Sequence, residues 1–179
     1  MLDKLTELIP IPTAPIDTSE KGLVAVSKAL GVRFPADFLE YSRTYGSGTI
    51  SAKVYDWEIY SAFRRTYPEF VTRFVARHDA FRRAMETEHI PLGLFPEPGG
   101  LLPFGRRDSV FFCWRTVGRP NDWTVGVIWE YQEGGFQLFD LNFSEFLTAF
   151  LARKLHVAGY TTKWNPKKDI TFESEVYSG

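Results

Sequence analysis

Two pairs of carboxylates are the residues best spaced for chemistry in this sequence. Asp56 and Glu58 stand two positions apart, and Glu130 and Asp140 flank a glycine-containing segment. Residues two apart in a strand, or opposite each other on neighbouring strands, project from the same sheet face. Each pair could therefore supply a general acid and a general base. Such pairs are also common on solvated sheet surfaces, so we favour an electrostatic role in binding over catalysis.

The other reactive side chains form no catalytic or metal-binding pattern. His78, His89 and His156 are far apart, and none belongs to a recognisable ligand run. We expect each of them at the surface or at a helix end. Cys113 is the single cysteine and stands between Phe112 and Trp114. Because a reactive thiol needs a polar and partly exposed setting, we expect Cys113 to be buried and inert.

The glycines do not form a nucleotide-binding loop. Gly46 and Gly48 are not followed by a glycine or a lysine at the required offset, and Ser47 between them does not stand in a strand-to-helix nucleophile elbow. We therefore predict no catalytic residue, no cofactor and no metal. The expected protein is not an enzyme.

Composition narrows the class of partner. The formal net charge is −1, which removes the bulk attraction expected of a general nucleic-acid binder. No apolar run approaches the roughly 20 residues needed to span a bilayer, and the first residues do not resemble a secretory signal. We expect a cytoplasmic chain with one domain over residues 1–179 and no membrane partner. The aromatic fraction of 16% suggests a protein interface in addition to a core.

The first half of the chain predicts three helices and a short pair of strands. Asp17 and Glu20 have capping-box spacing before a helix that ends at Gly31. Pro35 favours the start of the next helix, which ends at Gly46. Residues 49–54 and 57–60 alternate as strands do, and a long helix follows over residues 66–88.

The second half predicts two hairpins and a closing helix. Residues 101–105 and 109–116 form the first hairpin, with its turn at residues 106–108, and residues 123–130 and 136–141 form the second. Asn142 and Glu145 have capping-box spacing before the last helix. The expected fold is α+β, with an antiparallel meander sheet of about five to six strands packed against N-terminal, central and C-terminal helices. Residues 1–16 and 157–179 are expected to be arms, the second with an edge strand at 170–172.

The long helix is rich in arginine. Its basic residues fall between positions 64 and 83, and acidic residues such as Glu69 and Asp79 are interspersed. We favour a solvated helix face. The alternative is an anion-facing patch, built from Arg64, Arg65, Arg73, Arg77, Arg82 and Arg83.

The sequence resembles the SUKH superfamily. The run LGVRFPADFLEYSRTYGSGTI at residues 30–50 is similar to the signature of that family, and LLPFGRRDSVFFCW at 101–114 and NFSEFLTAFL at 142–151 continue the similarity. The resemblance covers residues 19–151. It is carried by scaffold positions, namely Leu30, Pro35, Gly46, Gly48, Gly105 and Phe146.

This resemblance implies a binding module without catalysis. Its bacterial members are most widely immunity proteins, which bind and neutralise a toxin delivered by a competing cell and encoded by a neighbouring gene. An adaptor or scaffold domain of a cell-wall or signalling regulator is the second hypothesis. A nucleic-acid binder that uses the arginines between positions 64 and 83 is the third, which the net charge disfavours.

Acidic and aromatic residues between the scaffold positions are the expected contacts of a partner. A few buried aromatics carry most of the affinity of an interface, and charges set its specificity. For Trp57 and Trp123 the alternative is packing at the edge of the core. The sequence also leaves open whether the chain forms a weak homo-oligomer through its edge strands. The expected partner-binding residues are Asp56, Trp57, Glu58, Tyr60, Trp123, Glu130 and Tyr131.

Overall fold

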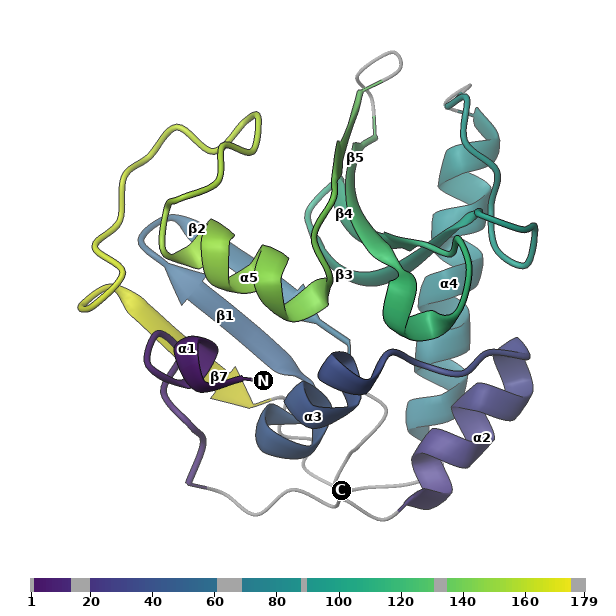
Figure 1. The fold of residues 1–179 in the computed structure, drawn as a ribbon, viewed down its shortest axis with the longest axis horizontal. Coiled ribbons are helices and arrows are strands. Elements are labelled where there is room, and N and C mark those ends of the chain that lie inside the picture. Colours follow the sequence, from purple (N-terminus) through teal and green to yellow (C-terminus); the bar gives the residue numbers. More distant parts are fainter. Residues whose placement is uncertain (1, 14–19, 61–68, 88–89, 131–134, 175–179) are drawn as a thin grey trace.

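A seven-stranded antiparallel sheet organises the chain (Figure 1). The computed structural model describes residues 2–13, 20–60, 69–87, 90–130 and 135–174, with the backbone alone at 20–22, 69–74 and 86–87. The strand order is β6-β5-β4-β3-β2-β1-β7, so the first six strands form a meander and the last returns beside β1. The strands are β1 (Gly48–Ala52), β2 (Tyr55–Ile59), β3 (Leu101–Arg107), β4 (Val110–Arg115), β5 (Thr124–Trp129), β6 (Phe136–Phe139) and β7 (Ile170–Ser174).

The expected α+β class with an antiparallel meander is confirmed, and the sheet has more strands than the expected five to six. The described helices are α1 (Asp3–Thr6), α2 (Glu20–Leu30), α3 (Ala36–Tyr45), α4 (Glu69–Thr87) and α5 (Phe143–Leu151), with one 3-10 turn at Pro120–Asp122. Within the described ranges, no helix combines the length and the hydropathy needed to span a bilayer.

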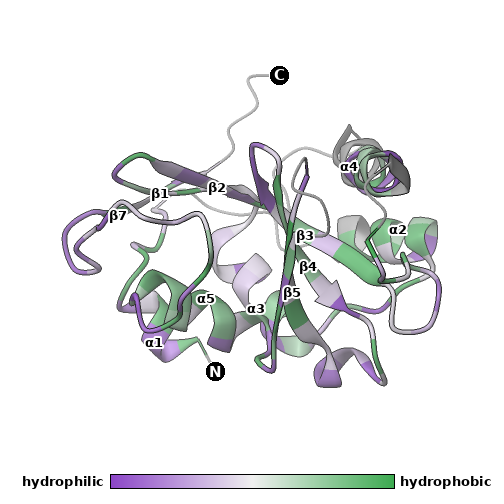
Figure 2. Ribbon diagram, turned by 90° about the horizontal axis from the view of Figure 1, so that it is seen from above, coloured by the Kyte–Doolittle hydropathy of each residue, from purple (hydrophilic) through white to green (hydrophobic). Residues whose placement is uncertain are grey.

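The main core lies between one face of the sheet, here called the inner face, and the helices α1, α3 and α5 (Figure 2). It is built largely from aromatic rings. The ring of Phe143 at the start of α5 stands 5.3 Å from Phe38 of α3 and 5.1 Å from Phe104 of β3, measured between centroids. Edge-to-face pairs of this kind add stability beyond the area that they bury. The high aromatic content is therefore used mostly inside the protein.

A second, smaller core lies on the opposite face of the sheet, here called the outer face. Phe81 and Met85 of α4 pack there with Leu101, Phe111 and Cys113 of β3 and β4. The strand β4 is consequently buried on both faces, which explains its unbroken run of apolar residues. The helix α2 lies beside α4 on this side of the molecule (Figure 2).

Helix α5 is fixed at its first turn by local and by tertiary hydrogen bonds. The predicted capping box is confirmed: Glu145 N–H donates to Asn142 Oδ1 at 2.9 Å, and Asn142 N–H donates to the Glu145 carboxylate at 3.1 Å. The buried Asp37 carboxylate of α3 accepts from Phe38 N–H at 2.8 Å and from Ser144 N–H at 2.9 Å. One carboxylate therefore satisfies first-turn donors of two helices.

The first predicted hairpin is confirmed, but its turn is tighter than expected. Arg106 and Arg107 continue β3 and pair with Phe111 and Val110 of β4, so the turn falls at Asp108 and Ser109. Asp108 has φ of 50°, a left-handed conformation that Asp tolerates. The basic residues belong to the strand because a two-residue turn matches the twist of the paired strands.

The two segments predicted as arms contribute side chains to the main core. Leu2, Leu5 and Ile9 are buried near the start of the chain, and Val157 and Trp164 are buried after α5. The predicted edge strand at 170–172 is confirmed as β7, which extends to Ser174 and pairs with β1 along its whole length. These segments are held by the core that they help to close.

Candidate protein-binding face

The half of the outer face made by β7, β1 and β2 carries polar side chains. No described helix lies over it, whereas α4 covers the half made by β3 to β5 (Figure 2). Strand register sets the arrangement. Thr49 lies between Glu58 and Glu173, and Ser51 lies between Asp56 and Thr171. These six residues, Thr49, Ser51, Asp56, Glu58, Thr171 and Glu173, are called the acidic face below.

The strands turn this side outward because their apolar residues alternate with these polar ones. In β1 and β2 the residues between them, such as Ile50 and Trp57, are buried against the inner core. Side chains of a strand alternate between the two faces with a period of two. The three carboxylates of this face belong to Asp56, Glu58 and Glu173. They point away from the inner core because the residues beside them in each strand point into it.

One of the three carboxylates is neutralised at the border of the face. Glu58 accepts from Arg106 Nε at 3.1 Å and forms an ion pair with Arg77 of α4, and its side chain is 24% exposed. Burial, and then the charge of Arg106, lowers the pKa of Arg77 to about 10, so the guanidinium stays charged at neutral pH. The Arg77 guanidinium also lies 4.7 Å from the centre of the Tyr60 ring. Glu58 thus joins α4 to β2 and β3.

The other two carboxylates remain on an open surface. Asp56 and Glu173 are exposed and stand on β2 and β7, on either side of β1. Near the β1–β2 turn, Lys53 makes an ion pair of 3.3 Å with Asp169, which precedes β7. Charges of this kind are worth little to stability when exposed, but they can be paired with opposite charges of a partner.

The aromatic residues predicted as contacts lie in the core. Trp57 and Tyr60 are each 1% exposed, and Trp123 is 6% exposed and stands 5.9 Å from Trp114 between ring centroids. Core packing, the alternative for Trp57 and Trp123, is therefore confirmed. A partner-binding role for these rings stays a prediction, and their burial argues against it. The sequence pattern could not distinguish core packing from contact with a partner. A strand face that packs against a helix of the same chain shows the same alternation of apolar residues as one that packs against a partner protein.

The structure brings some of the seven predicted contacts together and separates others. Asp56 and Glu58 share the acidic face, whereas Trp123 and Glu130 flank opposite ends of β5. Glu130 is half-buried, and its N–H donates to Ser109 O at 2.8 Å. Tyr131 lies outside the described residues. Asp140 follows β6 beside the start of β5, so Glu130 and Asp140 do not form the proposed pair.

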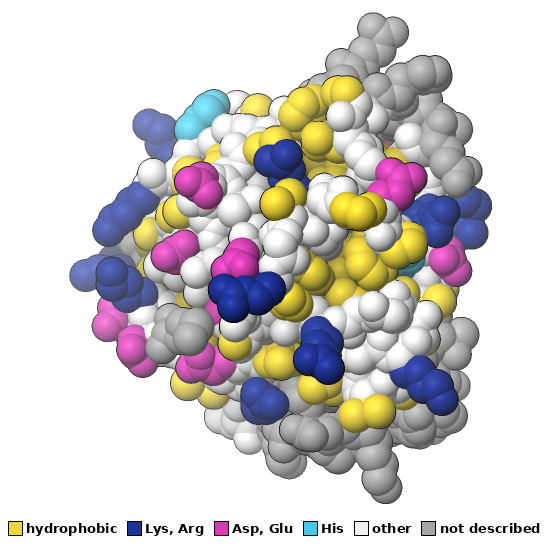
Figure 3. Space-filling model, turned by 45° about the vertical axis from the view of Figure 1, so that its right-hand side comes forward, with side chains coloured by type: hydrophobic (Ala, Val, Ile, Leu, Met, Phe, Trp, Pro, Cys, Tyr) yellow, Lys and Arg dark blue, Asp and Glu magenta, His cyan; other side chains and the backbone are white. Residues whose placement is uncertain are grey.

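The arginines of α4 do not present a single basic surface among the described side chains. Arg77 points to Glu58, while Arg82 and Arg83 are exposed. The side chains of Arg64, Arg65 and Arg73 lie outside the described residues. From the side where α2 and α4 lie, Figure 3 shows single basic side chains spread around an apolar area. This arrangement favours the solvated helix face over an anion-facing patch.

Of the described residues, His78, His156 and Cys113 take no part in a reactive cluster, and His89 lies outside the described residues. In the part of the chain that the structure describes, no three His, Cys, Asp or Glu side chains are grouped to hold a metal ion. The expectation of a surface position was wrong for His78, which is 6% exposed and faces the Phe95 ring. Burial lowers the pKa of His78. Cys113 is fully buried as expected, and burial raises the pKa of its thiol.

The sequence did not predict that four members of the acidic face lie together, or that Arg77 and Arg106 pair with Glu58. Thr49, Ser51, Thr171 and Glu173 come from strands that are distant in sequence, and β7 pairs with β1 across more than 110 residues. The alternation of residue types within positions 48–52 did indicate part of this face, because it places Thr49 and Ser51 on the side of the strand that faces away from Ile50. The partner strand of β1 was not readable from the sequence.

Comparison with known proteins places the chain in a family. The family model described as "SMI1-KNR4 cell-wall", one of the SUKH models, matches residues 20–147, which is more than two thirds of the chain. Searches of the curated proteins and of the solved structures found no match. The matched region contains the Pro35 helix, the meander from β1 to β6 and the start of α5. The resemblance drawn from the sequence is thereby confirmed, and the chain belongs to the SUKH superfamily.

Proposed function

We propose that this chain is a bacterial immunity protein, which binds a cognate toxin in the cytoplasm and neutralises it without catalysis. The toxin would be delivered by contact with a competing cell and encoded by a neighbouring gene. The observation that carries the proposal is the acidic face: three strands present polar side chains to a surface that no described helix covers. Membership of the SUKH superfamily supports the same class of function.

The charges of this face define the expected partner. Asp56 and Glu173 are exposed, while Glu58 is already paired with Arg77 and Arg106. A toxin with lysines or arginines opposite Asp56 and Glu173 would gain steering and specificity. A stable complex buries about 800 Å² on each partner, so the acidic face would form the centre of a wider contact.

The acidic face is built on rigid secondary structure, which favours tight binding. The acidic face lies on three paired strands whose other side packs in the aromatic core. A pre-organised surface loses little conformational entropy on binding. Neutralisation of a toxin calls for high affinity, and a dissociation constant of 1 nM corresponds to about 12 kcal/mol.

One observation favours a second function, that of an adaptor or scaffold domain in a cell-wall or signalling system. The matching family model carries the words "cell-wall" in its description. A scaffold would hold a constitutive partner, and its gene would have no toxin neighbour. Isolation of the chain with its partners from the source cells, together with the identity of the adjacent genes, distinguishes the two functions.

The decisive test is rescue of cells that express the product of the adjacent gene. The wild-type chain should restore growth and co-purify with that product. A double charge reversal, Asp56→Lys with Glu173→Lys, should abolish rescue, because like charges facing each other cost several kcal/mol in a complex. The matched control is Asp140→Lys, which reverses an exposed carboxylate next to β6 and should leave rescue intact.

Two results would contradict the proposal at different levels. Failure of the wild-type chain to rescue cells from any neighbouring toxin would reject the immunity function. Full rescue by the Asp56→Lys, Glu173→Lys variant would retain that function and reject the acidic face as the contact. Circular dichroism of each variant confirms that lost rescue does not come from lost folding.

A further inference from the structure

A cavity of about 310 Å³ opens at the C-terminal end of α5, beneath the segment that leads to β7. It lies on the inner side of the sheet, so it is separate from the acidic face. Its volume is at the lower end of the range of small-molecule sites, which is about 300–1,000 Å³. Its lining includes three aromatic and three basic residues: Phe150, Tyr160, Trp164, Arg153, Lys154 and His156.

The aromatic part of the lining is held firmly. The Phe150 ring stands 5.1 Å from Tyr160 and 5.7 Å from Trp164, measured between centroids. Phe150 and Trp164 are 2% and 6% exposed, and Trp164 Nε1 donates to Leu151 O at 2.8 Å. These buried rings support Tyr160 and Leu155, which are partly exposed and form an apolar wall of the cavity, against which a flat or aliphatic group can pack without rearrangement.

The basic part of the lining faces this wall. The guanidinium of Arg153 lies 5.3 Å from the centre of the Trp164 ring, within cation–π distance. Arg153 has φ of 58°, where the chain turns back after α5, and Lys154 and His156 follow it on exposed positions. Among the residues that the structure describes, no carboxylate lines the cavity. In a chain of net charge −1, this is a local concentration of positive charge.

The last carbonyls of α5, at the negative end of the helix, already accept hydrogen bonds from the chain, which weakens their repulsion of an anion. Arg153 N–H donates to Phe150 O, Lys154 N–H donates to Ala149 O, and the Trp164 indole occupies Leu151 O. Burial raises the pKa of Tyr160 to about 12, so its hydroxyl keeps its proton at neutral pH. The described groups that line the cavity are therefore cationic or neutral.

We propose that this cavity binds a small organic carboxylate. Its carboxylate would accept from Arg153 and Lys154, and its apolar or aromatic part would pack on Leu155 and Tyr160. Arginine offers a planar fork of donors that matches the two oxygens of a carboxylate. Two kinds of ligand carry a carboxylate next to an apolar group. One is a free organic acid, and the other is the carboxyl terminus of a peptide that ends in an apolar residue.

The test is titration of the folded, full-length chain, observed by the ¹H–¹⁵N signals of the Trp164 indole and of the backbone at residues 153–160. The probes are 3-phenylpropionate, the neutral 3-phenylpropanamide, inorganic phosphate and a tripeptide that ends in phenylalanine. The acid should give saturable shifts at these positions, and the amide should bind about tenfold more weakly or worse, because it lacks the charge. Tighter binding of the tripeptide would identify a chain terminus as the source of the carboxylate.

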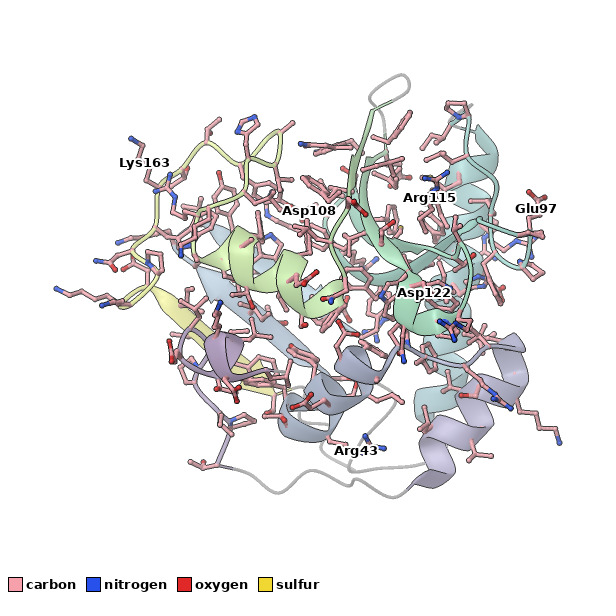
Figure 4. The ribbon with its side chains drawn as sticks, in the orientation of Figure 1. Arg43, Glu97, Asp108, Arg115, Asp122 and Lys163 are labelled. Atoms are coloured by element: carbon pink, nitrogen blue, oxygen red, sulfur yellow. The ribbon has the colours of Figure 1, made fainter. Side chains whose placement is uncertain are left out.

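Substitutions separate the cavity from general charge effects. Arg153→Gln and Lys154→Gln should each weaken binding of 3-phenylpropionate about tenfold. The matched control is Lys163→Gln, because Lys163 is exposed on the same segment and does not line the cavity (Figure 4). Circular dichroism checks folding, and Lys154→Gln keeps the test decisive if Arg153→Gln disturbs the contact with Trp164.

Four outcomes would overturn the proposal. Three of them are the absence of saturable shifts with the acid and the tripeptide, equal binding of the acid and its amide, and equal weakening by Lys163→Gln. Binding of phosphate as tightly as 3-phenylpropionate would also overturn it, since the aromatic wall would then contribute nothing.

Discussion

Replacement of Trp57 by alanine should destabilise the fold severely, while replacement of its neighbour Asp56 should not. Trp57 is 1% exposed, and its ring lies between 5.1 and 5.9 Å from the rings of Tyr55, Phe150, Tyr160 and Trp164. Truncation of a buried Trp to Ala costs about 3–5 kcal/mol, and the lost ring contacts place Trp57→Ala near the upper value. A loss of this size is a third or more of the stability of many domains.

The assay is urea unfolding at equilibrium, followed by circular dichroism, with a thermal melt beside it. For a chain of 179 residues, a loss of 5 kcal/mol corresponds to a fall in Tm of about 10–20 °C. Trp57→Phe should retain much of the packing and lose less. Asp56→Ala should stay within about 0.5 kcal/mol of the wild type, because Asp56 is exposed on the acidic face.

The reverse result would refute the assignment of the two residues to core and surface. If the free energy of unfolding of Trp57→Ala lay within about 1 kcal/mol of the wild-type value, the ring could not be part of the packed core. If that stable variant also failed to rescue cells from a toxin, Trp57 would be a contact residue, as the sequence alone had suggested. A large loss of stability in Asp56→Ala would equally contradict the open position of the acidic face.

Further predictions concern the helices and the reactive side chains. Asp37→Ala should cost about 3 kcal/mol in urea unfolding, since it leaves Phe38 N–H and Ser144 N–H without an acceptor, and Asp37→Asn should lose less. Phe146→Ala should cost about 3–5 kcal/mol in the same assay, because Phe146 is 1% exposed beneath the sheet. Burial lowers the pKa of His78, with Asp79 opposing and Arg82 adding to the shift. The neutral imidazole therefore stabilises the fold above its unfolded pKa of about 6.5, and this contribution should be lost as pH falls toward 5 and be absent in His78→Gln. The Cys113 thiol, buried with a raised pKa, should react with a thiol reagent only when urea unfolds the chain.

The local elements of the fold could be read from short-range signals. Pro35 and Gly46 bound α3, and the box of Asn142 and Glu145 begins α5, as the sequence predicted. These signals act within one helical turn, so neighbouring residues suffice to produce them. The apolar alternation of β1 and β2 likewise shows which side chains face the core.

The candidate site could be predicted only in part, for a physical reason. Asp56 and Glu58 were found because two residues in one strand must share a face. Glu173 was missed because the pairing of β7 with β1 joins distant segments, and such pairings depend on the whole core. Trp57 and Trp123 were ambiguous because a buried ring and an exposed interface ring have the same sequence pattern.

The sequence by itself determined the class of the fold, the superfamily, both ends of α3, the end of α2 and the start of α5, since caps, turns and alternation are local properties of the chain. The tertiary structure alone decided which surface is open. It placed α4 over β3 to β5, left the acidic face outside that cover, and joined Glu58 to Arg77 and Arg106. It also closed the cavity at the end of α5 with a segment that looked like a free arm. These features depend on contacts between segments far apart in the chain, which no local pattern encodes.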